Sequence, residues 1–168
     1  MFETPLHWIN ELAPQRLALT ARPRGGDDLQ NEVRSWRHAH VDIVVSLLES
    51  HEVRELELSA ESELCRENGL TFFSYPIKDR GTPNSNETFK VLVSQLGASL
   101  NSGKSVAIHC RAGIGRTGLL AGCILHLMGI PSKDIFRILS KARGVGVPDT
   151  AEQIEWVEGF AQRTKSSV

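Results

Sequence analysis

The feature that most constrains the fold is a glycine-rich segment, HCRAGIGRTG at 109–118, between a short apolar run and a long helical pattern. Its glycines spell G-x-G-x-x-G, the fingerprint of a dinucleotide-binding loop. Cys110 and Arg116, with five residues between them, also have the spacing of a phosphate cradle built around a reactive cysteine. Both kinds of loop hold an anion on backbone N–H groups where a strand runs into a helix. The segment therefore requires a buried strand before it and a helix after it.

The rest of the chain alternates apolar β-type runs with amphipathic helical patterns. VDIVVSLL is a continuous β-branched run, which is typical of a strand buried on both faces. Helical spacing of apolar residues is clearest in SNETFKVLVSQLGASLNSG. Strands are predicted at 16–21, 41–48, 70–77 and 104–110, and helices at about 28–40, 59–68, 85–103, 116–128, 132–143 and 150–164. This alternation predicts an α/β fold, with a central, mostly parallel sheet of about four to five strands flanked by helices.

Length and composition fit one globular domain. A chain of 168 residues can bury one core, and 40% hydrophobic with 23% charged residues is ordinary for a soluble protein. We expect a single domain over 1–168, with 1–15 as an N-terminal extension and 165–168 as a polar tail. The near balance of 19 basic and 20 acidic residues gives no reason to expect a nucleic-acid partner.

The cysteine count and the apolar stretches bear on the compartment. The apolar stretch GLLAGCILHLMGI is too short to span a bilayer, and the N-terminal residues lack the apolar run of a secretory signal. Three cysteines, an odd number, suit a reducing compartment, so we expect a cytoplasmic protein with no membrane span and favour a monomer. The six histidines show no metal-ligand spacing, and we expect neither a metal nor another cofactor.

The glycine-rich segment is not followed by the second strand that a dinucleotide-binding loop requires. Such a loop should lead, through a helix, to a second strand with an acidic residue about 20 positions on. Asp134 has about that offset, but it lies in IPSKDIFRILSKAR, which has helical periodicity. The Gly-x-x-x-x-Gly-Lys pattern of nucleotide triphosphatases does not occur. The sequence favours the cysteine loop.

The cysteine interpretation accounts for the loop residue by residue. Consecutive N–H groups at a helix amino terminus form a nest for a phosphate dianion, and glycines let the backbone turn inward. The planar fork of Arg116 matches two phosphate oxygens, which a lysine could not do. The same positive potential favours the thiolate of Cys110, the nucleophilic form. The residues expected to bind phosphate are Cys110, Arg111, Ala112, Gly113, Ile114, Gly115 and Arg116.

The stretch His109–Thr117, His-Cys-x-x-Gly-x-x-Arg-Thr, resembles the active-site loop of cysteine-based protein tyrosine phosphatases. VDIVVSLL, YPIKDRGTP, the loop and DTAEQ follow one another in the order of the compact, dual-specificity-like branch, which includes kinase-associated and bacterial members. The tyrosine-specific domains are much longer than this chain, which favours the compact branch. The resemblance implies a metal-free phosphomonoester hydrolase that forms a cysteinyl-phosphate.

The resemblance also implies roles for residues around the loop. Asp79, in PIKDRGTP, matches the family's general acid; alternatively, it only organises a turn. Thr117 is implied to hydrogen-bond the sulfur of Cys110, and it is also suited to cap the following helix. His109 is expected to brace the loop rather than to transfer protons.

Gln153 has two open interpretations. It matches the glutamine that positions water in tyrosine-phosphatase relatives, although Asp149 stands where their motif has its first glutamine. Thr150 and Gln153 also form a complete capping-box pattern. Cys65 and Cys123 are expected to fill core space, with a resolving thiol for oxidised Cys110 as the alternative.

The substrate is the least constrained part of the prediction. We expect a phosphorylated protein, with phosphotyrosine first and phosphoserine or phosphothreonine as further candidates. Phosphoinositide phosphatases carry basic residues at two loop positions, where this chain has Arg111 and Ile114, so a lipid or a small phosphorylated metabolite is the alternative. A non-catalytic phosphate-binding module would usually lack one of Cys110, Arg116 and Asp79, and this chain has all three. Families that carry out sulfur or arsenate chemistry at a similar cysteine loop lack the Gly-x-Gly-Arg-Thr cradle with an upstream acid, so this function is less favoured.

Overall fold

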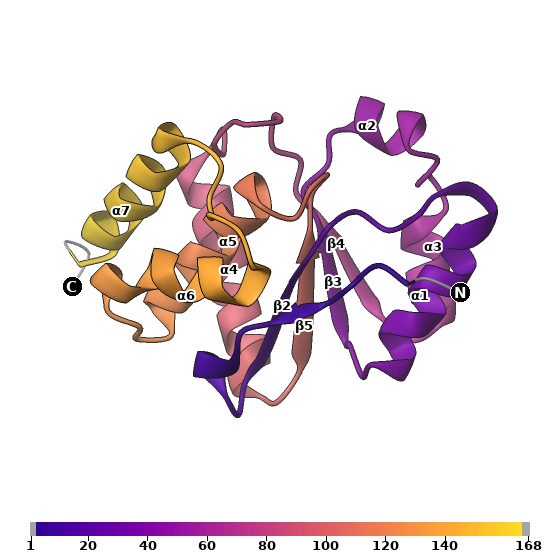
Figure 1. Ribbon diagram of the computed structural model, residues 1–168, viewed down its shortest axis with the longest axis horizontal. Coiled ribbons are helices and arrows are strands. Elements are labelled where there is room, and N and C mark those ends of the chain that lie inside the picture. The colour runs from indigo at the N-terminus through magenta and orange to yellow at the C-terminus, as the bar shows by residue number, and fades with distance from the viewer. Residues whose placement is uncertain (1–2, 166–168) are drawn as a thin grey trace.

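A five-stranded sheet separates two groups of helices in the computed structural model, which describes residues 3–165 (Figure 1). The strands are β1 His7–Trp8, β2 Arg16–Thr20, β3 Ile43–Ser46, β4 Thr71–Ser74 and β5 Ser105–His109. Their order across the sheet is β1-β2-β5-β3-β4, with β1 antiparallel to β2 and every other pair parallel. The predicted α/β class and the mostly parallel sheet are confirmed.

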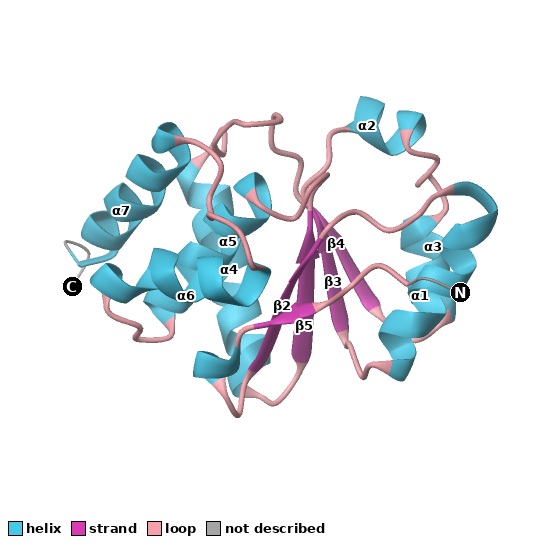
Figure 2. Cartoon of the chain, in the orientation of Figure 1, coloured by secondary structure: helices cyan, strands magenta, loops and turns pink. Residues whose placement is uncertain are grey.

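The helices cover both faces of this sheet (Figure 2). They are α1 Leu29–His38, α2 Ser50–Glu55, α3 Glu61–Glu67, α4 Asn86–Asn101, α5 Gly115–Leu127, α6 Ile135–Arg143 and α7 Ala151–Lys165. Short 3-10 turns occur at Asn10–Leu12, Gly26–Asp28 and Ser132–Asp134. Helices α4 to α7 lie on one side of the sheet, and α1 and α3 lie on the other (Figure 1). Within the described residues, no helix is long and apolar enough to cross a membrane.

Each predicted strand and helix occurs, and one further strand and one further α-helix were not predicted. Strand β1 lies in the segment 1–15, which was expected to be an extension, and it forms one edge of the sheet. Helix α2 follows β3 directly. Of the expected polar tail, Lys165 ends α7, and residues 166–168 lie outside the described part.

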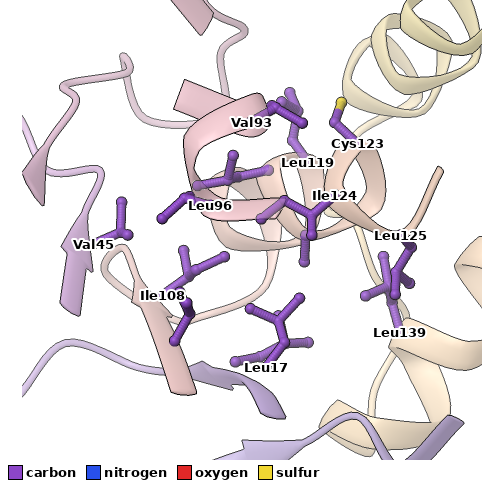
Figure 3. Packing of buried hydrophobic residues seen from close by; sticks show 14 of the residues in the cluster. Leu17, Val45, Val93, Leu96, Ile108, Leu119, Cys123, Ile124, Leu125 and Leu139 are labelled. Atoms are coloured by element: carbon purple, nitrogen blue, oxygen red, sulfur yellow. The ribbon is translucent and has the colours of Figure 1, made fainter. Parts of the chain in front are cut away.

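Two hydrophobic clusters use the alternation of side chains along the strands. Val45 and Ile108 point toward α4 and α5, where they meet residues such as Leu96 and Ile124 (Figure 3). The neighbouring Val44 belongs to the other cluster, with α1 and α3. Successive strand residues face opposite sides of a sheet, so a strand with a core on both sides reads as one continuous apolar run.

The carboxyl ends of the parallel strands meet at one edge of the sheet (Figure 1). Beyond the strands, Leu47 N donates to the carbonyl of His109 at 3.0 Å, and Ile77 N donates to the carbonyl of Leu47 at 3.0 Å. These bonds keep the segments after β3 and β4 beside the end of β5. Three loops, widely separated in the sequence, therefore converge at one place.

Candidate active site

The glycine-rich loop joins β5 to α5, as the sequence required. Cys110 follows the last residue of β5, and α5 begins at Gly115. Gly113 has a φ of +72°, and a Cβ built on it would lie 2.4 Å from the carbonyl oxygen of Thr20 at the end of β2. Only glycine fits this conformation and this close approach. The loop therefore packs closely against the carboxyl edge of the sheet.

A hollow of about 250 Å³ opens over this loop. Its lining consists of Asp79, Arg80, Cys110, Arg111, Ala112, Ile114, Gly115, Arg116 and Asp149. The structure thus brings the expected nucleophile, arginine and acid together at one concave surface. Cys110 itself is only 3% exposed, at the inner end of the loop.

A larger hollow of about 570 Å³ lies between α2, α3 and the ends of β3 and β4. No cysteine is among the described residues that line it, and it shares none of the lining of the smaller hollow. Size alone would select this larger hollow. We place the candidate active site at the smaller one because it holds a thiol beside a guanidinium and a carboxyl.

Arg116 is buried and fully engaged by its surroundings. Its Nη1 and Nη2 donate to the two carboxylate oxygens of Glu52, at 2.7 Å and 2.9 Å, and Nη1 also donates to the carbonyl of Ile77 at 2.9 Å. Burial by itself raises the pKa of Glu52, but hydrogen bonds from Arg116 and from the backbone N–H of Glu49 outweigh it and lower the pKa to about 2. Glu52 is therefore a carboxylate at neutral pH, and the bidentate pair fixes the plane of the guanidinium.

Sequence reasoning missed Glu52. The available signal was that an arginine next to a buried strand needs an anionic partner. Glu49, Glu52 and Glu55 recur at three-residue spacing after VDIVVSLL, and nothing in this spacing distinguishes one of them from the others. The structure selects Glu52, which α2 directs at the guanidinium.

Asp79 reaches the mouth of the hollow from the loop between β4 and α4. Its Oδ1 lies 3.2 Å from Nη2 of Arg116, and its side chain is 60% exposed. The next residue, Arg80, has a φ of 61°, and its Nη1 donates to Oδ2 of Asp149 at 2.9 Å. A carboxyl at this position can exchange a proton with a group bound in the hollow.

His109 is buried behind the loop. Its Nε2 lies 2.6 Å from Oε1 of Glu61, and its Nδ1 lies 3.2 Å from the carbonyl oxygen of Cys110. Burial alone lowers the pKa of His109, but the neighbouring Glu61 carboxylate outweighs burial and raises it. A carboxyl oxygen at one ring nitrogen and a carbonyl oxygen at the other are partners that favour the charged imidazolium. Glu61, at the start of α3, is a second residue that sequence reasoning missed.

Thr117 is buried in the first turn of α5. Its Oγ1 has no hydrogen-bond partner among the described residues, so the implied bond to the sulfur of Cys110 is not formed in this arrangement. Nor does a side chain cap the amino terminus of α5. The hydroxyl is left with its hydrogen-bonding capacity unused.

Gln153 forms the capping box that its sequence suggested. Its Oε1 accepts from the backbone N of Thr150 at 3.2 Å, and its own N donates to Oγ1 of Thr150 at 3.1 Å. Its Nε2 donates to the carbonyl of Gly81, in the loop that carries Asp79, at 3.1 Å. A Cβ on Gly115 would lie 3.0 Å from its Oε1, so the side chain also lies against the glycine-rich loop.

Two further arginines tie the glycine-rich loop to neighbouring elements, Arg111 from within the loop and Arg143 from α6. The side chain of Arg111 is half-exposed. Its Nε lies 3.5 Å from Oε1 of Glu52, and its Nη2 lies 3.5 Å from Oε2 of Glu55. Arg143, at the end of α6, donates from Nη2 to the carbonyl of Ala112 at 3.0 Å. Arg143 was not predicted, since nothing in a lone arginine at a helix end identifies the loop it reaches.

The other two cysteines lie in the two hydrophobic clusters. Cys123 belongs to the cluster with α4 and α5, and Cys65 to the cluster with α1. Burial raises the pKa of Cys123 well above its usual range, and burial together with the charge of Glu61 raises the pKa of Cys65 to about 12. Both are neutral thiols near neutral pH, which agrees with the expected role as core residues.

Comparison with known proteins gives a family match and a fold match. The family model described as "Polymorphic toxin system, DSP-PTPase phosphatase" matches residues 19–129. Among curated proteins, the putative tyrosine phosphatase 067L of Invertebrate iridescent virus 3 is 33% identical over 108 residues, which are 56% of this chain and 45% of the viral protein. Cyclin-dependent kinase inhibitor 3 of Rattus norvegicus is 22% identical over 138 residues, 81% of this chain and 65% of the rat protein.

The chain therefore spans between about half and two thirds of these curated relatives. A solved structure of kinase associated phosphatase, with its catalytic-site cysteine substituted by serine, superimposes with a TM-score of 0.88 at 20% identity. The superposition covers 100% of this chain and 99% of that one, and at this identity it shows the same fold.

Proposed function

Since this chain belongs to the DSP-PTPase phosphatase family of polymorphic toxin systems, we propose that it hydrolyses phosphomonoesters through a cysteinyl-phosphate intermediate. Membership confirms the resemblance to compact dual-specificity-like phosphatases drawn from the glycine-rich loop. The observation that carries the proposal is the convergence of Cys110, Arg116 and Asp79 on one hollow.

In the first step, the thiolate of Cys110 attacks phosphorus and forms an S–P bond while the ester P–O bond breaks. The carboxyl proton of Asp79 goes to the leaving oxygen. Arg116 and the loop N–H groups stabilise the charge spread over the phosphoryl oxygens.

In the second step, water attacks phosphorus, the S–P bond breaks, and Cys110 leaves as a thiolate. Asp79, now ionised, takes the proton of the water. The buried Oγ1 of Thr117, without a partner in the described structure, supports a role as hydrogen-bond donor to the departing sulfur. The amide of Gln153, between Gly81 and Gly115, supports a role in positioning the water beside its capping function.

Arg116 needs its partner on α2 for this chemistry. Glu52 occupies one edge of the guanidinium with two hydrogen bonds, and the Nη2 that contacts Asp79 also faces the hollow. When a phosphoryl group is bound, one of its oxygens replaces Asp79 at that nitrogen, which frees the carboxyl to turn toward the leaving group.

We propose phosphotyrosine in proteins as the first substrate, with phosphoserine and phosphothreonine as further substrates. The viral relative is named as a putative tyrosine phosphatase, and the exposed Asp79 indicates a mouth that a protein chain can reach. We further propose that 1–168 is one phosphatase domain that acts as a cytoplasmic monomer. The three free cysteines support a reducing compartment.

The test is hydrolysis of p-nitrophenyl phosphate with EDTA present, with and without vanadate. We expect turnover that EDTA leaves unchanged, that vanadate inhibits, and that Cys110→Ser abolishes. Cys65→Ser, with its fold checked by circular dichroism, is the matched control that keeps turnover. Equal activity of Cys110→Ser and the wild type would contradict the proposal. A panel of phosphotyrosine peptides, phosphoserine peptides and phosphoinositides then distinguishes the substrate classes.

A further inference from the structure

We propose that Arg80 and Asp149 are positioning residues, whose ion pair docks the loop carrying Asp79 onto the amino-terminal end of α7. This inference rests on the proposed function, because the docked loop is the one that supplies the general acid. Gln153 assists through its bond to Gly81 in the same loop.

The contact joins segments that are distant in the sequence. Nη1 of Arg80 donates to Oδ2 of Asp149 at 2.9 Å, and Nε2 of Gln153 donates to the carbonyl of Gly81 at 3.1 Å. The acid loop lies between β4 and α4, and its partners come from the segment that leads into α7. Two adjacent residues of the acid loop are therefore tied to one short segment.

That short segment also lies against the glycine-rich loop. A Cβ on Gly115 would lie 3.0 Å from Cβ of Asp149 and 3.0 Å from Oε1 of Gln153. Asp149 and Gln153 thus contact both the loop that carries the nucleophile and the loop that carries the acid. We infer that these contacts help to set the distance between Cys110 and Asp79.

The backbone of the acid loop directs its two charged side chains to different partners. Gly81 N donates to the carbonyl of Lys78 at 2.7 Å, which closes a tight turn around Asp79 and Arg80. Arg80 has a φ of 61°, a left-handed conformation that is unfavourable for a residue with a Cβ. In this turn, Asp79 contacts Arg116 and Arg80 contacts Asp149. The ion pair therefore holds the turn in the conformation that points Asp79 at the hollow.

Asp149 is the position where this chain departs from the glutamine motif of tyrosine-phosphatase relatives. A glutamine there has no charge, whereas the carboxylate gives Arg80 an ionic partner. The two side chains are 64% and 42% exposed, so the pair can open and close in solvent. An exposed pair of this kind shifts a loop equilibrium modestly and leaves the fold intact.

The test uses two aryl phosphates that differ in their need for an acid. Phenyl phosphate has a poor leaving group that requires protonation, whereas 2,4-dinitrophenyl phosphate has a good one that does not. We expect Arg80→Ala and Asp149→Asn each to lower kcat/KM for phenyl phosphate about two- to fivefold, the range for an exposed ion pair, because kcat/KM reports the step in which the leaving group departs. Their kcat/KM for 2,4-dinitrophenyl phosphate should equal that of the wild type.

The double variant Arg80→Ala/Asp149→Asn should lose no more activity than the worse single variant, because both changes remove one interaction. Asp79→Ala sets the reference, with the same leaving-group dependence and a larger loss. Arg66→Ala, which removes an equally exposed ion pair with Glu63 on α3, is the control that keeps wild-type kinetics.

Equal losses of kcat/KM on both substrates, or additive losses in the double variant, would overturn the docking role. If the wild type hydrolyses both substrates and the variants behave as Arg66→Ala does, this inference fails and the proposed function stands. If the wild type hydrolyses neither, the proposed function fails and the inference fails with it.

Discussion

Arg116 and Glu52 are opposite charges that the fold buries together. Each is almost fully shielded from solvent, and two short hydrogen bonds join them. Removing one partner of such a pair costs about 3–5 kcal/mol, because the other charge is left buried without compensation. The pair therefore links the stability of the protein to the geometry of the arginine that we propose binds phosphate.

Replacing Glu52 with glutamine should change how stability depends on pH. The folded-state pKa of about 2 lies below the ordinary value of 4.5, so Glu52 stabilises the protein above pH 4.5 and loses this contribution as the pH falls toward 2. The shift corresponds to roughly 3 kcal/mol. We expect Glu52→Gln to be less stable than the wild type near neutral pH, with the difference shrinking below pH 4.5, as measured by urea denaturation.

Glu55→Gln is the matched control for this measurement. Glu55 lies on the same helix, is exposed, and is 3.5 Å from Arg111. Its replacement should change stability by less than about 1 kcal/mol. A stability difference between wild type and Glu52→Gln that is the same at every pH would contradict the assignment of Glu52 as a buried carboxylate.

At the scale of elements, α5 is the helix against which α4, α6 and α7 pack. It is buried from Arg116 to Leu125. A Cβ on Gly118 would lie 2.2 Å from Cγ1 of Val147, in the segment that leads into α7. The glycine thus lets this segment come near enough to place Asp149 beside the hollow.

Gly118→Ala should displace the segment before α7. The extra methyl group overpacks the contact, which costs typically about 1–3 kcal/mol, and it should also lower kcat because Asp149 moves away. Val147→Ala in the same chain removes the clashing methyl and should restore part of both losses. Thermal unfolding and p-nitrophenyl phosphate turnover measure the two effects.

Gly122→Ala, one turn further along α5, is the control. A Cβ there would lie 3.1 Å from Val157, a milder contact, and alanine is the better helix former by roughly 1 kcal/mol. If Gly118→Ala is as well tolerated as Gly122→Ala, the close approach of the two segments is not required.

The sequence predicted the long elements well and missed the short ones. Continuous β-branched runs and the helical spacing of apolar residues identify long elements, because the residues of each element themselves show which of its faces is buried. Strand β1 has only two residues, too few to show a strand pattern of their own. It forms by pairing with β2, a contact that its own residues do not indicate. Helix α2, SHEVRE, has one apolar residue, Val53, and therefore no apolar face that a sequence pattern could show. Missing α2 meant missing Glu52.

In the candidate site, likewise, the residues that are neighbours in the sequence were predicted, and several of those contributed by other elements were not. Cys110, Arg116 and the residues between them are adjacent in the sequence, so their pattern was visible. Glu61 and Arg143 act on that loop from other elements, and finding them requires knowing which strand ends and helix ends adjoin it. Local chemistry was predictable, and the contacts that orient it were not.

At the scale of the whole molecule, the sheet order explains why the site forms where it does. Strand β5 lies between β2 and β3, so its carboxyl end is surrounded by the loops of its neighbours. The family match covers 19–129, which includes the nucleophile loop and Asp79. Asp149 and Gln153 lie beyond it, in the segment that leads into α7 and in α7 itself.

The central claim is that Cys110 carries the phosphoryl group during turnover. The direct measurement is rapid quenching of the wild type in alkaline denaturant, in which an S–P bond survives, while it hydrolyses a phosphotyrosine peptide, followed by mass spectrometry of its proteolytic fragments. We predict one added phosphoryl group on the fragment that contains Cys110, and none on that fragment in Cys110→Ser. Hydrolysis of the peptide with phosphate on a different residue, or with no phosphorylated fragment at any quench time, would contradict the account.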